Sequence, residues 1–173
     1  MWELHLSTVD STNSLAKFLL ANGMPGPIAI SADRQTAGRG SHERKWHSDQ
    51  WGGLYYSLAV SGINFAEIPD LTIRVARTCS QVVRQLYGIE LQIEWPNDLI
   101  LDGKKLGGIL TEMVTGGANH SPHGIIGIGL NVNQQTFPDW LRPVAISLIQ
   151  RDGVYRSLIP LKQSITKELL AWL

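Results

Sequence analysis

A glycine-rich basic segment at residues 34–46 constrains this chain more than any other feature. It reads Arg-Gln-Thr-Ala-Gly-Arg-Gly-Ser-His-Glu-Arg-Lys-Trp. Glycine lets backbone N–H groups approach an anion closely, because no Cβ blocks the way. Arg39 adds a planar set of donors that matches phosphate or carboxylate, and Trp46 offers a flat apolar face for a ring system. The segment predicts a loop that closes over a nucleotide or an anionic intermediate; a flexible surface loop is the alternative.

The composition indicates one domain, which we expect to include residues 1–173. Lys plus Arg equals Asp plus Glu at 15 each, whereas a dedicated duplex-DNA binder is usually more basic. The single cysteine, Cys79, excludes an internal disulfide, and its apolar helical surroundings assign it to the core rather than to a nucleophile. The N-terminus lacks a secretory signal, and no apolar run approaches a membrane span. These features predict a soluble, cytoplasmic protein with neither DNA nor membrane as a partner.

Helical and extended patterns alternate along the chain, and they predict the α+β class. Residues 10–13 supply helix caps, and Leu15, Phe18 and Leu19 follow at helical spacing up to Asn22-Gly23. The connection at 33–52 has a length that is typical of functional or disordered loops. Further helices are expected at 71–86 and 158–169, and strands at 27–32, 54–60, 91–95 and 125–130.

A hairpin is predicted at Asp102-Gly103, because these two residues separate two apolar runs. With a two-residue turn, Leu101 faces Lys104 and Ile100 faces Lys105.

Side chains alternate between the faces of a strand, so Asp98, Ile100, Lys105 and Gly107 are expected to project to one side. A glycine pair within a strand usually marks the close approach of a ligand or of another backbone. Lys105 would then lie beside a slot floored by Gly107, where it could hold a phosphate as a point charge. The alternative is that Lys104 and Lys105 are solvated charges at a hairpin tip.

The preceding Trp95-Pro96-Asn97-Asp98 places hydrogen-bonding and metal-capable oxygens next to this slot. The alternative for Asn97 and Asp98 is a simple turn.

Seven blocks of sequence, taken in order, resemble the catalytic domain of biotin protein ligases, which are biotin–[acetyl-CoA carboxylase] ligases. The resemblance covers nearly the whole chain, and the ordered set is far more specific than any single block. It implies a mixed, largely antiparallel sheet with helices packed on one side. The lipoate ligases and octanoyltransferases share the fold, but Gly-Arg-Gly together with Trp-Pro-Asn-Asp looks like the biotin branch. The blocks are residues 10–13, 35–40, 44–46, 53–58, 95–99, 105–112 and 127–133.

The resemblance implies a two-step reaction. Biotin and ATP, with Mg²⁺, first give biotinyl-5′-adenylate and pyrophosphate, and the adenylate then acylates a lysine on a biotin carboxyl carrier protein of acetyl-CoA carboxylase. Relatives often pair sheets edge to edge, so a homodimer is possible. The alternatives are a lipoate or octanoate transferase of the same fold and a non-catalytic biotin-binding module.

Site residues are carried over from the resemblance by position. Arg39 and Lys105 would be the catalytic residues, and the metal ligands stay open. The implied nucleotide-binding residues are Arg39, Trp46, Asn97 and Asn131. The implied biotin-binding residues are Ser11, Thr12, Asn13, Gln35, Gly38, Arg39, Gly40, Lys105, Gly107 and Gly108.

The chain departs from the family pattern at several positions. Ser41 stands where many members have an arginine that helps to retain the adenylate, so we expect either looser retention or a substitute contact from Arg44. Glu94 replaces a frequent lysine, which puts one positive contact in doubt. The chain stops at Leu173 without the small C-terminal domain, and it begins ten residues before Ser11, so no DNA-binding helix-turn-helix is expected.

Overall fold

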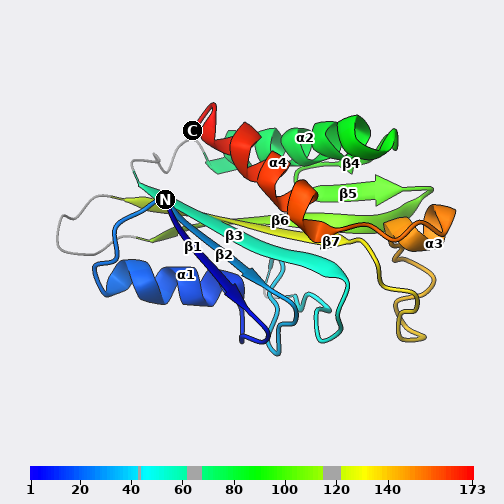
Figure 1. Cartoon of the computed structure of the whole chain (residues 1–173), viewed down its shortest axis with the longest axis horizontal. Coiled ribbons are helices and arrows are strands. Elements are labelled where there is room, and N and C mark those ends of the chain that lie inside the picture. The colour runs from blue at the N-terminus through cyan, green and yellow to red at the C-terminus, as the bar shows by residue number, and fades with distance from the viewer. Residues whose placement is uncertain (43, 62–67, 115–121) are drawn as a thin grey trace.

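The computed structural model describes residues 1–42, 44–61, 68–114 and 122–173, so Glu43 of the basic segment lies outside the described residues. Figure 1 shows a broad twisted sheet with helices above and below it. The strands are β1 (Trp2–Leu6), β2 (Ile28–Ala32), β3 (Gly53–Ser61), β4 (Gln92–Glu94), β5 (Asp98–Leu101), β6 (Lys104–Val114) and β7 (His123–Asn131). The helices are α1 (Thr12–Ala21), α2 (Ile68–Tyr87), α3 (Leu148–Asp152) and α4 (Leu158–Leu170).

One seven-stranded sheet organises the described part of the chain, in the order β1-β2-β3-β7-β6-β5-β4. β1 and β2 are parallel, and the other neighbouring pairs are antiparallel. The α+β class and the mixed, largely antiparallel sheet are therefore confirmed. None of the described helices is long and apolar enough to cross a membrane.

The structure differs from the expected arrangement in one respect, because helices cover both faces of the sheet. α1 lies on one face, and α2 and α4 lie on the other (Figure 1). β3 explains this, because it is apolar on both sides. Tyr56 and Leu58 belong to the core under α2 and α4, whereas Ala59 packs with Ala16 and Leu20 of α1. Cys79 is fully buried in the first of these cores, and burial raises the pKa of its thiol to about 12.

The side of α1 that faces the sheet is polar at its start and apolar further along, where Ala16 and Leu20 are buried. Ser11 caps the helix by accepting a hydrogen bond from the Ser14 N–H. Thr12 and Asn13 are buried, whereas Phe18, which the helical spacing grouped with the apolar residues, is 61% exposed. The first turn of α1 therefore presents Thr12 and Asn13 to β3 and β7.

The β5–β6 hairpin begins as predicted and then changes register. Leu101 pairs with Lys104 and Ile100 with Lys105, but the next pair is Leu99 with Gly107. β6 thus carries one extra residue, which is the definition of a β-bulge. Beyond the bulge, each side chain of β6 lies on the face opposite to the one that simple alternation predicts.

Candidate functional site

A cavity of about 260 Å³ lies between the start of α1, strands β6 and β7, the basic segment and the connection that follows β7. It brings together most of the site residues predicted from the sequence. Those that line it are Ser11, Thr12, Asn13, Gln35, Arg39, Gly40, Trp46, Asn97, Lys105, Gly108 and Asn131. Gly38 and Gly107 do not.

Gly107 is a correction to the predicted slot. A Cβ at this position would lie 2.4 Å from Leu130 Cδ2 and 3.5 Å from Leu99 Cδ1, so Gly107 faces the core under α2. The bulge in β6 is the cause. Gly108 takes the expected place, because its Cβ would lie 3.5 Å from Lys105 Cε and 3.7 Å from Asp98 Oδ1.

Gly38 has a packing role within the basic segment. A Cβ there would lie 2.2 Å from Ser48 Oγ and 2.6 Å from the Trp46 carbonyl oxygen. The Trp46 N–H donates to the Gly38 carbonyl at 2.9 Å, and the Gly40 N–H donates to the Arg44 carbonyl at 2.7 Å. The segment therefore folds back on itself as an irregular hairpin, and Gly38 lets its two arms approach.

Two glycines of β7 complete the floor of the cavity, although the sequence reasoning did not select them. A Cβ on Gly129 would lie 2.6 Å from Trp46 Cε2, so the indole lies directly on this strand. A Cβ on Gly127 would lie 2.4 Å from Asn13 Oδ1. Glycine at alternate positions of an apolar strand was the available signal, because alternate residues share a face.

Replacing Gly129 with alanine should displace the Trp46 ring. Because the indole cannot move away from the strand without losing its packing, we expect a loss of about 1–3 kcal/mol in the free energy of unfolding. Denaturant unfolding measures this effect. Gly108→Ala is the matched comparison, because its Cβ has ordinary contacts of 3.5 Å with Trp46 and Lys105, and it should have the smaller effect. Equal effects of the two variants would contradict the assignment.

A buried polar cluster lies at the α1 end of the cavity. Gln35 Oε1 accepts from the Thr12 N–H at 2.9 Å and from Thr12 Oγ1 at 3.2 Å, and Gln35 Nε2 donates to Ser48 Oγ at 3.1 Å. Ser57 donates to Asn13 Oδ1 at 2.5 Å. Ser57 was missed, although a serine in the middle of the apolar β3 run was a visible signal.

Two of the cations that line the cavity, Arg39 and Lys105, are held by carboxylates from the sheet. Arg39 donates to Glu112 Oε2 at 2.7 Å, and Asn13 Nδ2 donates to the same oxygen at 2.8 Å. Lys105 Nζ donates to Asp98 Oδ2 at 2.6 Å and lies 5.7 Å from the centroid of the Trp46 ring. The Arg39 and Lys105 head groups are thus fixed at the cavity by ion pairs, and Glu112 is a further residue that sequence reasoning did not select.

A further wall of the cavity comes from the connection after β7. This connection is attached to β6, because the Lys105 N–H donates to the Val144 carbonyl at 2.8 Å and the Ile146 N–H donates to the Lys105 carbonyl at 3.1 Å. Trp140 is 69% exposed, and its ring meets that of His47 edge to face at 6.0 Å. No motif marked this wall, which consists of Phe137, Trp140, Leu141, Val144 and Ala145.

The two substituted positions differ in their relation to the cavity. Ser41 lines it, and Arg44 donates to Ser41 Oγ at 2.8 Å and to the Ser41 carbonyl at 3.2 Å. Glu94 is exposed, and it is not among the cavity residues.

Within residues 1–42, 44–61, 68–114 and 122–173, no group of three or more His, Cys, Asp or Glu side chains could hold a metal ion. Asp98 Oδ1 is buried and has no hydrogen-bond partner in that part of the chain, so it is a carboxylate oxygen beside Lys105 that could still accept one.

The fold and the site define an α+β domain that binds a ligand over a mixed sheet, in a cavity with a glycine floor and two fixed cations. Comparison with known proteins identifies the family to which this domain belongs. The chain belongs to the biotin/lipoate A/B protein ligase family, whose model matches residues 6–131.

Individual relatives are named as ligases. The chain is 40% identical over 153 residues to the bifunctional ligase/repressor BirA of Bacillus spizizenii, covering 87% of this chain and 47% of the relative. It is 31% identical over 156 residues to the biotin–[acetyl-CoA-carboxylase] ligase of Mycobacterium tuberculosis, covering 83% and 54%. The chain therefore spans about half the length of the curated relatives that it matches.

The fold also matches a solved structure. The biotin protein ligase of Aquifex aeolicus in complex with biotin and ATP superposes with a TM-score of 0.81 at 31% identity. The match covers 99% of this chain and 71% of that structure.

Proposed function

We propose that this chain activates biotin with ATP to form biotinyl-5′-adenylate and then transfers the biotinyl group to a lysine of a biotin carboxyl carrier protein. The observation that carries the proposal is the placement of Arg39 and Lys105 in one cavity with Trp46 and the polar cluster of α1. The relatives support the substrates, because the name of the Mycobacterium tuberculosis relative specifies biotin ligation and the Aquifex aeolicus ligase was solved with biotin and ATP.

Biotin would enter with its ureido ring toward the start of α1. Ser11, Thr12 and Gln35 present small donors and acceptors there, and a ring with adjacent N–H and C=O groups needs such partners. Asn13 would play a supporting part, because Ser57, Glu112 and Leu110 already occupy its amide, which packs directly against Gly127. We assign Asn13 to the support of the biotin site.

The nucleotide would lie over the strand glycines, with Trp46 against adenine and Asn97 and Asn131 as polar contacts. The biotin carboxylate oxygen attacks the α-phosphorus, a P–O bond forms, and pyrophosphate leaves with the electron pair of the broken P–O bond. The reaction brings two anions together, so Arg39 and Lys105 would offset their repulsion and stabilise charge on the phosphoryl oxygens. No nucleophilic side chain is required.

Mg²⁺ would arrive with ATP and be held mainly by phosphate oxygens, as is usual for this ion. Asp98 Oδ1 is the protein oxygen that we assign to it, directly or through water. The basic segment would act as a lid that keeps water from the adenylate before the carrier lysine attacks. We place this reaction in the cytoplasm.

The test is to mix the protein with biotin, ATP and Mg²⁺ and to search for biotinyl-adenylate by mass spectrometry. Adding a carrier domain then tests transfer to its lysine. An adenylate formed from lipoate or octanoate instead of biotin would favour the transferase alternative. Biotin binding without release of pyrophosphate would indicate that the protein is a non-catalytic biotin-binding module.

Arg44 is expected to replace the arginine that the family resemblance implies at position 41. Its guanidinium is held at Ser41 by two hydrogen bonds and lines the cavity, so it can reach an anionic intermediate. We expect Arg44→Ala to release the adenylate about ten-fold faster, since a charge-assisted hydrogen bond is lost. Ser41→Arg should slow the release. The measurement is the dissociation rate of labelled adenylate, and an unchanged rate in Arg44→Ala would contradict the assignment.

A further inference from the structure

Gln134 is a buried side chain beneath the nucleotide end of the cavity. It follows β7 and is 2% exposed. Its amide meets three groups: the Val132 N–H at 2.8 Å, the Tyr55 hydroxyl at 3.1 Å and Asn131 Oδ1 at 3.3 Å. Neither Gln134 nor Tyr55 is among the cavity residues, whereas Asn131 is.

The hydrogen bonds fix the direction of this amide network. A backbone N–H only donates, so the Gln134 atom that meets Val132 is the carbonyl oxygen, and the other atom is the donating nitrogen. Tyr55 donates to the Gln50 carbonyl at 3.1 Å, which only accepts, so its hydroxyl oxygen is free to accept from Gln134. Burial raises the pKa of Tyr55 to about 12, which keeps the hydroxyl protonated at neutral pH.

The same argument determines the orientation of the Asn131 amide. Gln134 Nε2 must donate, so the Asn131 atom facing it is Oδ1, and Nδ2 is the end that can meet a ligand. The side-chain amide of Asn97 has the opposite orientation, because its Nδ2 donates to the Ile109 carbonyl at 3.3 Å and leaves Oδ1 to accept from a ligand. One asparagine thus offers a donor to the nucleotide and the other an acceptor. Adenine presents N6–H₂ as a donor and N7 as an acceptor, whereas guanine presents two acceptors, O6 and N7, on this edge.

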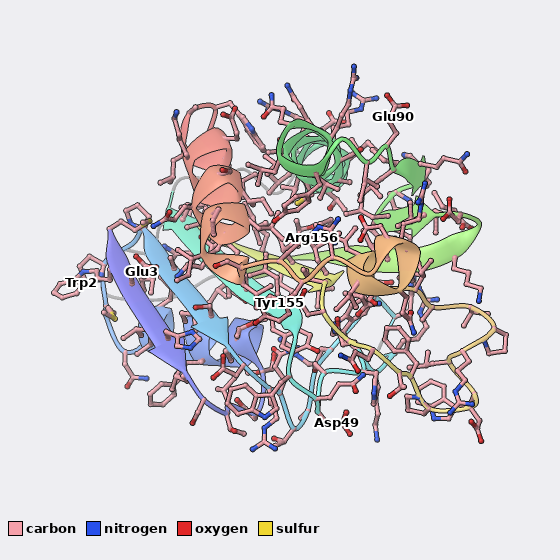
Figure 2. All side chains as sticks on the ribbon, turned by 45° about the vertical axis from the view of Figure 1, so that its right-hand side comes forward. Trp2, Glu3, Asp49, Glu90, Tyr155 and Arg156 are labelled. Carbon is pink, nitrogen blue, oxygen red and sulfur yellow. The ribbon has the colours of Figure 1, made fainter. Side chains whose placement is uncertain are left out.

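We propose that Gln134 is a positioning residue that holds the Asn131 amide with its donor toward the nucleotide. This inference rests on the proposed function, in which Asn131 contacts ATP. Gln134 is itself well anchored. Its backbone carbonyl accepts from Ser147 Oγ at 2.6 Å, and the side chain of the neighbouring Asn133 exchanges hydrogen bonds of 2.7 and 2.9 Å with the Arg156 backbone. Figure 2 shows Arg156 between α3 and the start of α4, so these helices hold the chain after β7 in place.

The test replaces Gln134 with glutamate, which has the same shape. Carboxylate oxygens can still accept from the Val132 N–H but cannot donate to Asn131, so the Asn131 amide turns and offers its oxygen to the nucleotide. We expect the dissociation constant for ATP to rise about ten-fold, the equivalent of one hydrogen bond. The dissociation constant for biotin should stay within about two-fold, because the biotin end lies at α1.

A double-mutant cycle separates positioning from general support of the fold. If Gln134 acts through Asn131, then Asn131→Ala and the double variant Asn131→Ala/Gln134→Glu should bind ATP equally weakly. Tyr55→Phe is the matched control for the network. It removes the two hydrogen bonds of the Tyr55 hydroxyl but leaves the Gln134 bonds to Val132 and Asn131, so stability should fall while ATP affinity stays within about two-fold.

Asn131→Asp tests the orientation even if the Gln134 variant fails to fold. It presents an acceptor where we assign a donor, so the affinity for adenosine, which carries no phosphate charge, should fall about ten-fold. Retained adenosine binding in this variant would overturn the proposal, and so would an unchanged ATP affinity in a folded Gln134→Glu protein or additive losses in the cycle. If the unaltered protein bound neither biotin nor ATP, the proposed function itself would fail.

Discussion

Lys105→Ala is expected to lower pyrophosphate release by about two orders of magnitude or more, judging from the loss of single charge-stabilising donors in other active sites. Lys105 Nζ lies between Asp98 and the Trp46 ring, so it is held where the carboxylate and the α-phosphate are proposed to meet. Its loss removes a positive charge from a reaction between two anions. It also leaves the Asp98 carboxylate without its partner, which adds repulsion.

Lys104→Ala is the control for this prediction. Lys104 is the neighbouring residue on the same hairpin, but its ammonium donates to the Arg142 carbonyl at the surface, and it is not among the cavity residues. Single-turnover pyrophosphate release should therefore be unchanged in Lys104→Ala. Near-normal release by Lys105→Ala would contradict the role of Lys105. The double variant Asp98→Asn/Lys105→Ala is compared with Asp98→Asn alone, because both lack the carboxylate that we assign to Mg²⁺, and their difference is the effect of Lys105 without an unpaired carboxylate.

The β5–β6 hairpin shows which parts of the strand register can be predicted from the sequence and which cannot. The turn at Asp102-Gly103 and the first two residue pairs were predicted correctly, because a two-residue turn determines the register next to it. The bulge was not predicted, since it depends on how β6 packs against β7 and the core. For this reason Gly107 was assigned to the slot that Gly108 occupies.

The prediction of which side of a helix is buried was limited in a similar way. Leu15, Phe18 and Leu19 were chosen by hydrophobicity, but α1 buries Thr12 and Asn13 and leaves Phe18 exposed. The buried side of α1 faces a functional cavity, and its polar side chains are paired with Gln35, Ser57 and Glu112. A polar site at the base of a helix removes the amphipathic signal on which sequence reasoning depends.

Contacts between distant segments could not be read from the chain at all. The ion pair between Arg39 and Glu112 and the contact of Trp46 with Gly129 join residues that are more than 70 positions apart. The residue types were recognised individually, since glycine, tryptophan and arginine have characteristic roles. Their partners follow only from the strand order, which brings β6 and β7 beneath the basic segment.

Arg39→Ala is expected to reduce adenylation to a similar degree, about 100-fold. Arg39 differs from Lys105 because its guanidinium can contact two oxygens at once. One of its nitrogens is bonded to Glu112, so the remaining donors are held in a defined plane toward the cavity. Arg39→Lys keeps the charge but loses this planar set of donors, and we expect it to recover only a small part of the activity.

Arg34→Ala is the matched control for Arg39. It removes the same charge from the start of the basic segment, but Arg34 contacts Trp51 and Thr8 and is not among the cavity residues. Adenylation should be near normal in this variant. Glu112→Gln completes the experiment, because it keeps a hydrogen-bond acceptor for Arg39 and Asn13 but removes the negative charge. If Glu112 only orients Arg39, Glu112→Gln should retain most of the activity that Arg39→Ala loses; a loss as large as that of Arg39→Ala would show that the ion pair itself is required.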